Sequence, residues 1–209
     1  MDLLLSTAYF PSIEYMACLS KANHVFIEKH ETYPKQSLRN RCYLAGSQGV
    51  QMLTVPVVKI QGKNTPIDEI RIDDNQDFRN HHFKSIQTLY SSAPFFDYYI
   101  DFIKEDIFNS ETHLLEYNLI IIRRLMSFLK IQVDISFTDC FQKYENNKLD
   151  LRTVISHKSA FGSFSIIKKV PFYSQVFREK NGFFENLSVI DLIFNEGPSA
   201  SSILKNSSI

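Results

Sequence analysis

Residues 3–27 read LLLSTAYFPSIEYMACLSKANHVFI, and this stretch decides the fold class. The apolar run at 3–5 predicts a buried strand, and Ser12 is a typical N-cap for a helix whose apolar residues follow at helical spacing. The helix is expected to end near Asn23, and residues 24–27 predict a second strand. This order of strand, helix and strand indicates a parallel pair of strands joined by a right-handed crossover.

The polar residues that follow these two strands are candidates for a binding site. Ligands of open α/β sheets bind beyond the carboxyl ends of the strands. Here those ends are residues 6–11, which include Tyr9, and residues 28–31. We therefore expect the mouth of a site where these two segments meet.

The charge-rich stretch EKHETYPKQSLRNRC, residues 28–42, begins at the end of the second strand. It is either a solvated connection or the polar floor of a site. Its position at a carboxyl strand end favours a site. Glu28 and Glu31 are also able to pair with Arg39 or Arg41 in a purely structural network, and the sequence leaves that alternative open.

The rest of the chain predicts further strands and a mainly helical second half. Strands are expected at 51–60, interrupted by Pro56, at 67–72 and at 133–137. Helices are expected at 78–90, 95–108, 112–129 and 186–194, the last stopped by Gly197-Pro198. Residues 144–165 resist assignment, apart from a turn at Asn146-Asn147 and a loop at 161–163. We expect an α/β fold with an N-terminal β-α-β unit in a mixed sheet, in one domain over 1–209.

Composition narrows the class of protein. The chain has 209 residues, of which 44% are hydrophobic and 22% charged, and 23 basic residues balance 23 acidic ones. Such a balance does not favour a nucleic-acid-binding protein. Three scattered cysteines favour reduced thiols, the N-terminus shows no signal peptide, and the longest apolar run, at 119–122, is too short for a membrane span. We expect a cytoplasmic protein.

Several common chemical motifs are missing. No glycine-rich phosphate loop, HExxH motif or GxSxG elbow occurs. His81 and His82 are adjacent, so on a helix they point about 100° apart and make a poor metal pair. The sequence indicates no metal ligands, and it leaves the metal requirement, the cofactor and the oligomeric state open.

Two polar groups remain as candidates in the first half of the chain. Arg39 and Arg41 flank Asn40, and this arrangement is able to clamp a carboxylate or phosphate while the amide orients it. A solvated loop with surface arginines is the alternative. His82 is a candidate general acid or base. A core histidine with satisfied hydrogen bonds is the alternative for that residue.

Two further groups lie near the carboxyl end. Tyr173 and Gln175 would share one face of a strand, either in a site or as buried groups that satisfy the backbone. Asp191 lies in the first turn of the last predicted helix, and Asn195 follows one turn later. Helix capping and the helix dipole explain Asp191 without a site, and the sequence does not choose between these alternatives.

Taken together, these segments resemble the WbqC-like protein family nearly end to end. The segments that carry the resemblance are the start AYFPSIEYMACLSKANHVFIE, Asn40-Arg41, LTVPV (53–57), HFKSIQTLY (82–90), SAPFFDYY (92–99), YSQVF (173–177) and NLSVIDLIFNEGP (186–198). The family start often reads HQPxYLP. Here Leu5-Ser6-Thr7-Ala8 precede Tyr9, so the His-Gln pair is absent and His82 becomes the main candidate base.

The resemblance implies a setting rather than a reaction. The namesake of the family belongs to gene clusters for bacterial surface polysaccharides such as O-antigen. In that setting we expect either an enzyme that transfers an acyl or aminoacyl group to an activated amino sugar, or a non-catalytic scaffold of glycan or envelope assembly. A small-molecule substrate, such as a nucleotide-sugar or an acyl donor, would suit the enzyme, and exposed aromatic residues would suit the scaffold.

If the chain is an enzyme, each candidate residue has an expected role. Arg39 and Arg41 would form the anion clamp and His82 would be the base. The substrate would be positioned by Tyr9, Asn40, Tyr173, Gln175 and Asn195. Asp191 would orient a histidine or a donor. Convergence of these side chains on one pocket would favour the enzyme over the scaffold.

Overall fold

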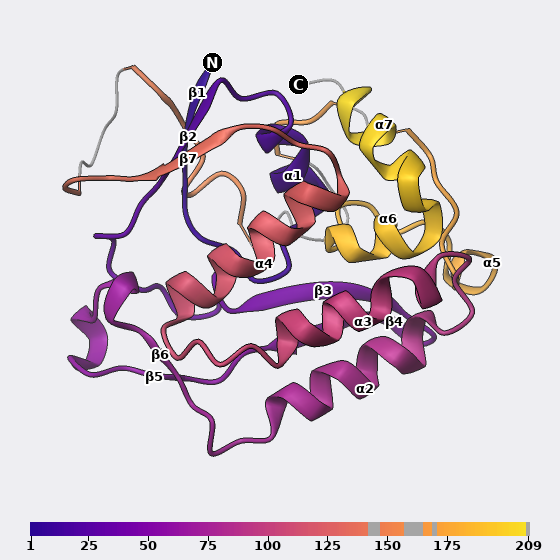
Figure 1. Ribbon diagram of the computed structural model, residues 1–209, viewed down its shortest axis with the longest axis horizontal. Helices are drawn as coiled ribbons and strands as arrows, with labels where there is room; N and C mark the ends of the chain where they lie inside the picture. The colour runs from indigo at the N-terminus through magenta and orange to yellow at the C-terminus, as the bar shows by residue number, and fades with distance from the viewer. Residues whose placement is uncertain (142–146, 157–164, 169–170, 208–209) are drawn as a thin grey trace.

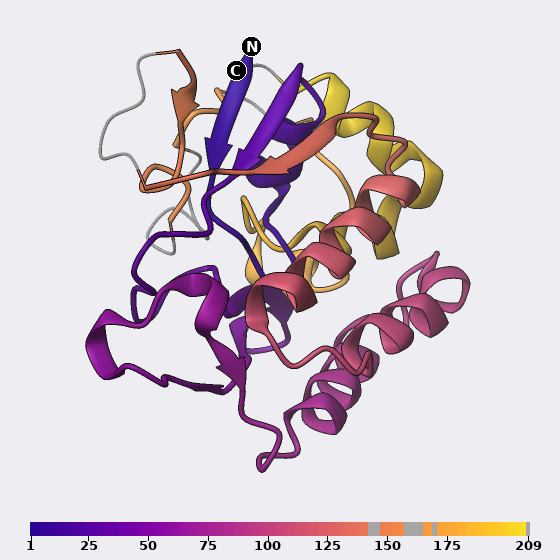
Figure 2. The ribbon, with the colours of Figure 1, turned by 60° about the vertical axis from the view of Figure 1, so that its left-hand side comes forward.

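A four-stranded parallel sheet organises the fold in this computed structural model, which describes residues 1–141, 147–156, 165–168 and 171–207 (Figure 1). Its strand order is β7-β2-β1-β8. The bounds are β1 Asp2–Leu5, β2 His24–Ile27, β7 Asp134–Phe137 and β8 Leu149–Asp150. Figure 2 shows β1 and β2 side by side in the same direction. Helix α1, Ile13–Leu19, links them, so the expected β-α-β unit and the α/β class are confirmed.

The local sequence explains this unit. Leu3, Leu4 and Leu5 are all buried, as expected of a central parallel strand covered on both faces. The Ser12 hydroxyl accepts a hydrogen bond of 3.3 Å from the Tyr15 backbone N–H, which confirms Ser12 as the N-cap.

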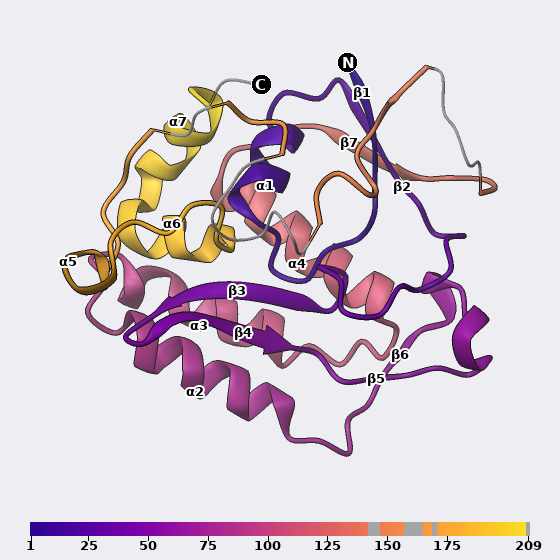
Figure 3. The same ribbon diagram turned by 180° about the vertical axis from the view of Figure 1, so that it is seen from behind.

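Two small antiparallel ladders lie beside the parallel sheet. In the first, β3 (Arg41–Gly46) pairs with β4 (Gly49–Thr54); in the second, β5 (Val57–Val58) pairs with β6 (Arg71–Ile72). Figure 3 shows the β3–β4 hairpin alongside α2 and α3. Pro56 separates β4 from β5, which confirms the predicted interruption. Strand β3 was not predicted.

The predicted strand at 67–72 is wrong over most of its length. Ile67–Glu69 forms the 3₁₀ helix η2, and a short 3₁₀ helix η1 covers Gly62–Asn64. Ile67 and Ile70 are both fully buried, a spacing of three that suits a 3₁₀ turn. The Ile67 N–H donates to the Glu31 carbonyl at 2.9 Å. This hydrogen bond joins the 3₁₀ helix η2 to the charge-rich stretch 28–42.

The predicted helices are confirmed to within a few residues at each end, and two helices that were not predicted, α5 and α7, are added. Their bounds are α2 Phe78–Tyr90, α3 Phe96–Ile107, α4 Leu114–Phe128, α5 Arg178–Asn181, α6 Val189–Glu196 and α7 Ala200–Lys205. Gly197-Pro198 does end α6, but the 3₁₀ helix η3 (Gly197–Ser199) leads directly into α7, which was not predicted. Figure 1 shows α6 and α7 beside α1.

A buried carboxylate joins the two ends of the chain. Glu14 on α1 is fully buried, and its Oε1 accepts hydrogen bonds from the backbone N–H groups of Ser165, Ile166 and Ile167 at 2.6, 2.7 and 3.3 Å. Its Oε2 accepts one from Asn186 Nδ2 at 3.2 Å. These bonds hold segments from the second half of the sequence against the first helix.

Part of the stretch that resisted assignment is also described. Within 147–156 the chain forms β8, the strand next to β1. The predicted loop at 161–163 and Asn146 of the predicted turn lie outside the described residues.

Gly197 gives a test of the α6–α7 corner. Its φ is +51°, and an added Cβ would lie 2.4 Å from the Phe95 ring. Gly182 also has positive φ, +76°, but nothing lies within 4 Å of its added Cβ. We expect Gly182→Ala to lower the free energy of unfolding by about 2 kcal/mol through backbone strain. Gly197→Ala should lower it by roughly 2 kcal/mol more through overpacking. Urea unfolding measures both, and equal losses would show that the Phe95 ring moves aside.

Candidate functional site

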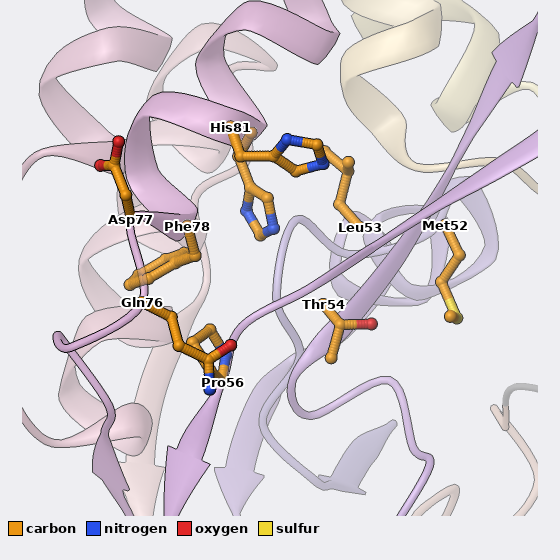
Figure 4. Close-up of a pocket in the computed structure, with 9 residues that line it drawn as sticks. Met52, Leu53, Thr54, Pro56, Gln76, Asp77, Phe78 and His81 are labelled. Carbon is orange, nitrogen blue, oxygen red and sulfur yellow. The ribbon is translucent and has the colours of Figure 1, made fainter.

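The candidate site is a pocket of about 370 Å³ between the end of β4 and the start of α2 (Figure 4). This volume suits a small-molecule site. It is lined by Met52, Leu53, Thr54, Pro56, Gln76, Asp77, Phe78, His81 and His82. Polar groups therefore come from both walls, since Thr54 lies on the strand side and the two histidines lie on the helix.

His82, the predicted base, forms the inner wall of this pocket. Its side chain is 2% exposed, and its Nδ1 lies 2.8 Å from the Tyr9 hydroxyl oxygen. Burial raises the pKa of Tyr9 well above its ordinary value, so Tyr9 is a neutral phenol, and its hydroxyl shares this hydrogen bond with Nδ1. The structure thus brings together two predicted residues, one from α2 and one from the end of β1.

The protonation state of His82 follows from its surroundings. Burial, with a contribution from the neighbouring His81, lowers the pKa of His82 to about 4, although a hydrogen bond to the Thr54 backbone raises it. The tautomer with Tyr9 as donor to Nδ1 has its ring proton on Nε2. Tyr9 occupies Nδ1 and the low pKa makes His82 a weak base, so His82 holds the pocket wall in place rather than presenting a free base.

His81 is the accessible imidazole of the pocket. Its side chain is exposed, and Figure 4 shows its ring between α2 and the strand that carries Leu53 and Thr54. Asp77 at the helix start also lines the pocket, and its Oδ1 accepts a hydrogen bond from Asn80 Nδ2 at 2.7 Å. Sequence reasoning considered His81 only as a metal ligand. Its place one residue before His82, at the exposed start of an amphipathic helix, was the available signal.

Arg39 lies elsewhere, at the carboxyl edge of the parallel sheet. Its Nε and Nη2 donate to the two carboxylate oxygens of Glu31 at 2.6 and 2.5 Å, and Nη2 also donates to Ser6 Oγ at 2.5 Å. This buried ion pair is the network that the sequence had left open as an alternative. A second pair lies beside it, where Arg152 Nη1 donates to Glu28 Oε2 at 2.9 Å. Arg152 lies in the stretch that resisted assignment, and no sequence signal indicated its role.

Asn40 and Arg41 diverge from Arg39. Asn40 Nδ2 donates to the Val55 carbonyl at 2.8 Å, which fastens the start of β3 to the end of β4. Arg41 is half-buried at the first position of β3 and hydrogen-bonds Tyr43, and its Nε is buried with no hydrogen-bond partner among the described residues. Arg39 and Arg41 therefore do not point at one shared anion, and a ligand role for Arg41 stays a prediction.

The carboxyl-terminal candidates form a third group around Asp191. Tyr90 and Tyr173 donate to the two oxygens of this fully buried carboxylate at 2.9 and 2.5 Å, and Gln175 Nε2 donates to Oδ2 at 3.2 Å. Asn195 Nδ2 donates to the Asp191 backbone carbonyl at 2.7 Å. Burial raises the pKa of Asp191 to about 6, although the three side-chain hydrogen bonds lower it. The group ties α2 to α6, and Tyr90 was the member that sequence reasoning missed.

The predicted site residues thus fall into separate groups. Tyr9 meets His82, and Tyr173, Gln175, Asp191 and Asn195 meet one another. Within the described ranges, no hydrogen bond joins either group to Arg39, and no cluster of three or more His, Cys, Asp or Glu side chains is placed to hold a metal. The described residues therefore do not show the convergence on one pocket that would favour the enzyme over the scaffold, and the catalytic and binding roles assigned from the sequence stay predictions.

The parallel sheet, with helices packed around it and polar residues at its carboxyl edge, places the protein in the α/β class. A family model, that of the WbqC-like protein family, matches residues 7–169, so the chain belongs to this family. The carboxyl-terminal motif at 173–198 lies beyond the matched range. No curated protein and no solved structure matches the chain. Family membership suggests involvement in polysaccharide biosynthesis only loosely.

None of the helices in the described ranges has the length and apolar character needed to cross a membrane.

The lowered pKa of His82 predicts a pH-dependent contribution to stability. The unfolded chain protonates this imidazole near its ordinary pKa of about 6.5, whereas the folded chain protonates it near 4. Stability from this residue is therefore complete above about pH 6.5 and is lost as the pH falls towards 4. Between these limits the difference in unfolding free energy between the wild type and His82→Gln should shrink by about 3 kcal/mol. Urea unfolding at several pH values measures it, and a constant difference would contradict the buried neutral state.

The Arg39–Glu31 pair predicts strong coupling between its members. Arg39→Met leaves Glu31 buried without its cation, so we expect a loss of about 3–5 kcal/mol in unfolding free energy. Adding Glu31→Gln to that variant should restore most of the loss, because the uncompensated charge is removed. A double-mutant cycle by urea denaturation measures the coupling. Losses that simply add would show that the two side chains act independently.

Proposed function

We propose that this protein is an enzyme of bacterial surface-polysaccharide biosynthesis that transfers an acyl or aminoacyl group to an activated amino sugar in the pocket beside α2. The observation that carries the proposal is the pocket itself, since an exposed imidazole, His81, faces an open volume of about 370 Å³ with polar groups on both walls. Family membership supplies the setting.

The proposed transfer reaction needs a general base for the attacking amine more than it needs cationic side chains that bind an anion. The amine nitrogen of the sugar attacks the carbonyl carbon of an activated acyl donor and forms an N–C bond. The bond between that carbon and its carrier breaks, and the carrier leaves with the electron pair. His81 accepts the proton that the amine loses. His82 and Tyr9 act as positioning residues, because they fix the start of α2 and the strand end that carries Thr54.

A non-catalytic scaffold is the second candidate, and a groove on the helical side favours it. A shallow groove of about 560 Å³ lies over α3 and α4 and is lined by Phe102, Ile120, Arg123, Arg124, Ser127 and Phe128. Exposed aromatic and arginine side chains are common in protein interfaces. Failure of every small-molecule test below would favour this candidate.

The first test is ligand binding followed by turnover. Purified protein is screened by thermal shift against nucleotide-linked amino sugars, acyl donors and aminoacyl donors, because a ligand of the folded state raises the unfolding temperature. Pairs that produce a shift are then incubated, and mass spectrometry measures the amide product.

Removing the base should remove turnover without removing the fold. We expect His81→Asn to lower kcat/KM by about a hundredfold or more, the usual effect of losing a general base. The matched control is His113→Asn, the same change at a half-exposed histidine before α4 that does not line the pocket. Unchanged turnover in His81→Asn, or no thermal shift with any compound class, would refute the proposal.

A further inference from the structure

The strand order creates a second candidate site on the other side of β1. The chain leaves β1 through α1 to β2 on one side, while β8, which comes from much later in the sequence, pairs with β1 on the other side. In open α/β sheets such a reversal of strand order opens a crevice at the carboxyl ends, where ligands bind. In this protein that position lies between the ends of β1 and β8.

The residues at this position line a narrow crevice. It is bounded by Leu5, Ser6, Thr7, Ala8, Tyr15, Leu38, Arg39, Leu151, Arg152 and Ile155. Its volume is about 10 Å³, which is about the space that one water-sized group occupies. Only a single hydroxyl or carbonyl oxygen of a ligand fits inside, and the remainder of that ligand stays outside.

Unused hydrogen-bonding capacity at this crevice points to such a group. Thr7 is 2% exposed, and its Oγ1 is buried with no hydrogen-bond partner among the described residues. A buried polar group without a partner is costly, so a partner supplied by a ligand would be favoured. Arg39 uses Nε and Nη2 to hold Glu31 and Ser6, and its Nη1 donates to none of the described residues.

The charges around the crevice decide the chemical class of the ligand. Arg39 is paired with Glu31, and Arg152 is paired with both Glu28 and Asp150. Three carboxylates therefore face two guanidinium groups, and this balance disfavours a phosphate or another strong anion. A neutral oxygen that accepts from Arg39 and exchanges a hydrogen bond with Thr7 is compatible with it.

We propose that the crevice between the ends of β1 and β8 is a sugar subsite in which Thr7 and Arg39 bind one hydroxyl or carbonyl oxygen of a neutral saccharide. It is separate from the pocket that contains His81. The subsite rests on the proposed function only in the choice of a sugar as the ligand.

The test compares Thr7→Val with Thr138→Val. Valine has the shape of threonine without its hydroxyl. Thr7→Val should raise the thermal midpoint of the free protein, because it removes an unpartnered buried hydroxyl. Thr138→Val should lower the midpoint, because the Thr138 hydroxyl donates to Glu28 Oε1 at 2.8 Å. A lowered midpoint in Thr7→Val would overturn the premise that its hydroxyl has no partner.

Binding is measured by ligand-observed NMR with glucose, galactose and N-acetylglucosamine at millimolar concentrations. We expect at least one sugar to bind the wild type, Thr7→Val to weaken it by roughly tenfold, about the worth of one hydrogen bond, and inorganic phosphate not to compete. His81→Asn should bind this sugar like the wild type, whatever its effect on turnover.

Three results would overturn the subsite. They are no sugar binding by the wild type, equal binding by Thr7→Val, and loss of all sugar binding in His81→Asn, which would assign the signal to the other pocket. Competition by phosphate would overturn the neutral chemical class. Failure of the proposed transfer reaction is distinguishable, because it appears as absent amide product while the sugar still binds.

Discussion

The buried ion pair between Arg39 and Glu31 is the junction on which the other parts of the molecule depend. The Arg39 guanidinium also donates a hydrogen bond to Ser6 Oγ at the end of β1. The backbone carbonyl of Arg39 accepts one from Asn118 Nδ2 on α4 at 2.7 Å. The next residue, Asn40, fastens the β3–β4 hairpin through the Val55 carbonyl. A single bend in the chain thus connects the parallel sheet, the hairpin and the longest helix. The dense charge of residues 28–42 is therefore explained in large part by architecture.

Local patterns in the sequence predicted the elements that local physics determines. The run at 3–5, the cap at Ser12 and the apolar face of α4 each act over a few residues, so they are visible in the sequence. The hairpin strand β3 and the η2 turn depend on distant partners, such as the Glu31 carbonyl that accepts from Ile67. Helix α7 was hidden by Gly197-Pro198, because this pair ends one helix and permits another to begin at a new angle.

The candidate site was predicted less well, because residue type does not determine where a side chain points. His82 and Tyr9 were both identified, yet their contact spans 73 positions and occupies Nδ1 of the histidine. His81, one residue earlier, remains accessible because neighbours on a helix face different directions. Asp191 was also identified, but its hydrogen bonds to Tyr90, Tyr173 and Gln175 make it the centre of a buried network between helices.

The carboxylate of Glu14 has a consequence for the order in which the chain folds. It binds backbone N–H groups at 165–167, which follow it by 151 to 153 positions, and Asn186, which follows it by 172. Closing so long a loop is entropically costly, and the gain arrives only when the ends have met. During synthesis the first helix emerges long before these partners exist. Glu14 cannot form these bonds until the last quarter of the chain has left the ribosome, so this set of hydrogen bonds belongs to a late step of folding.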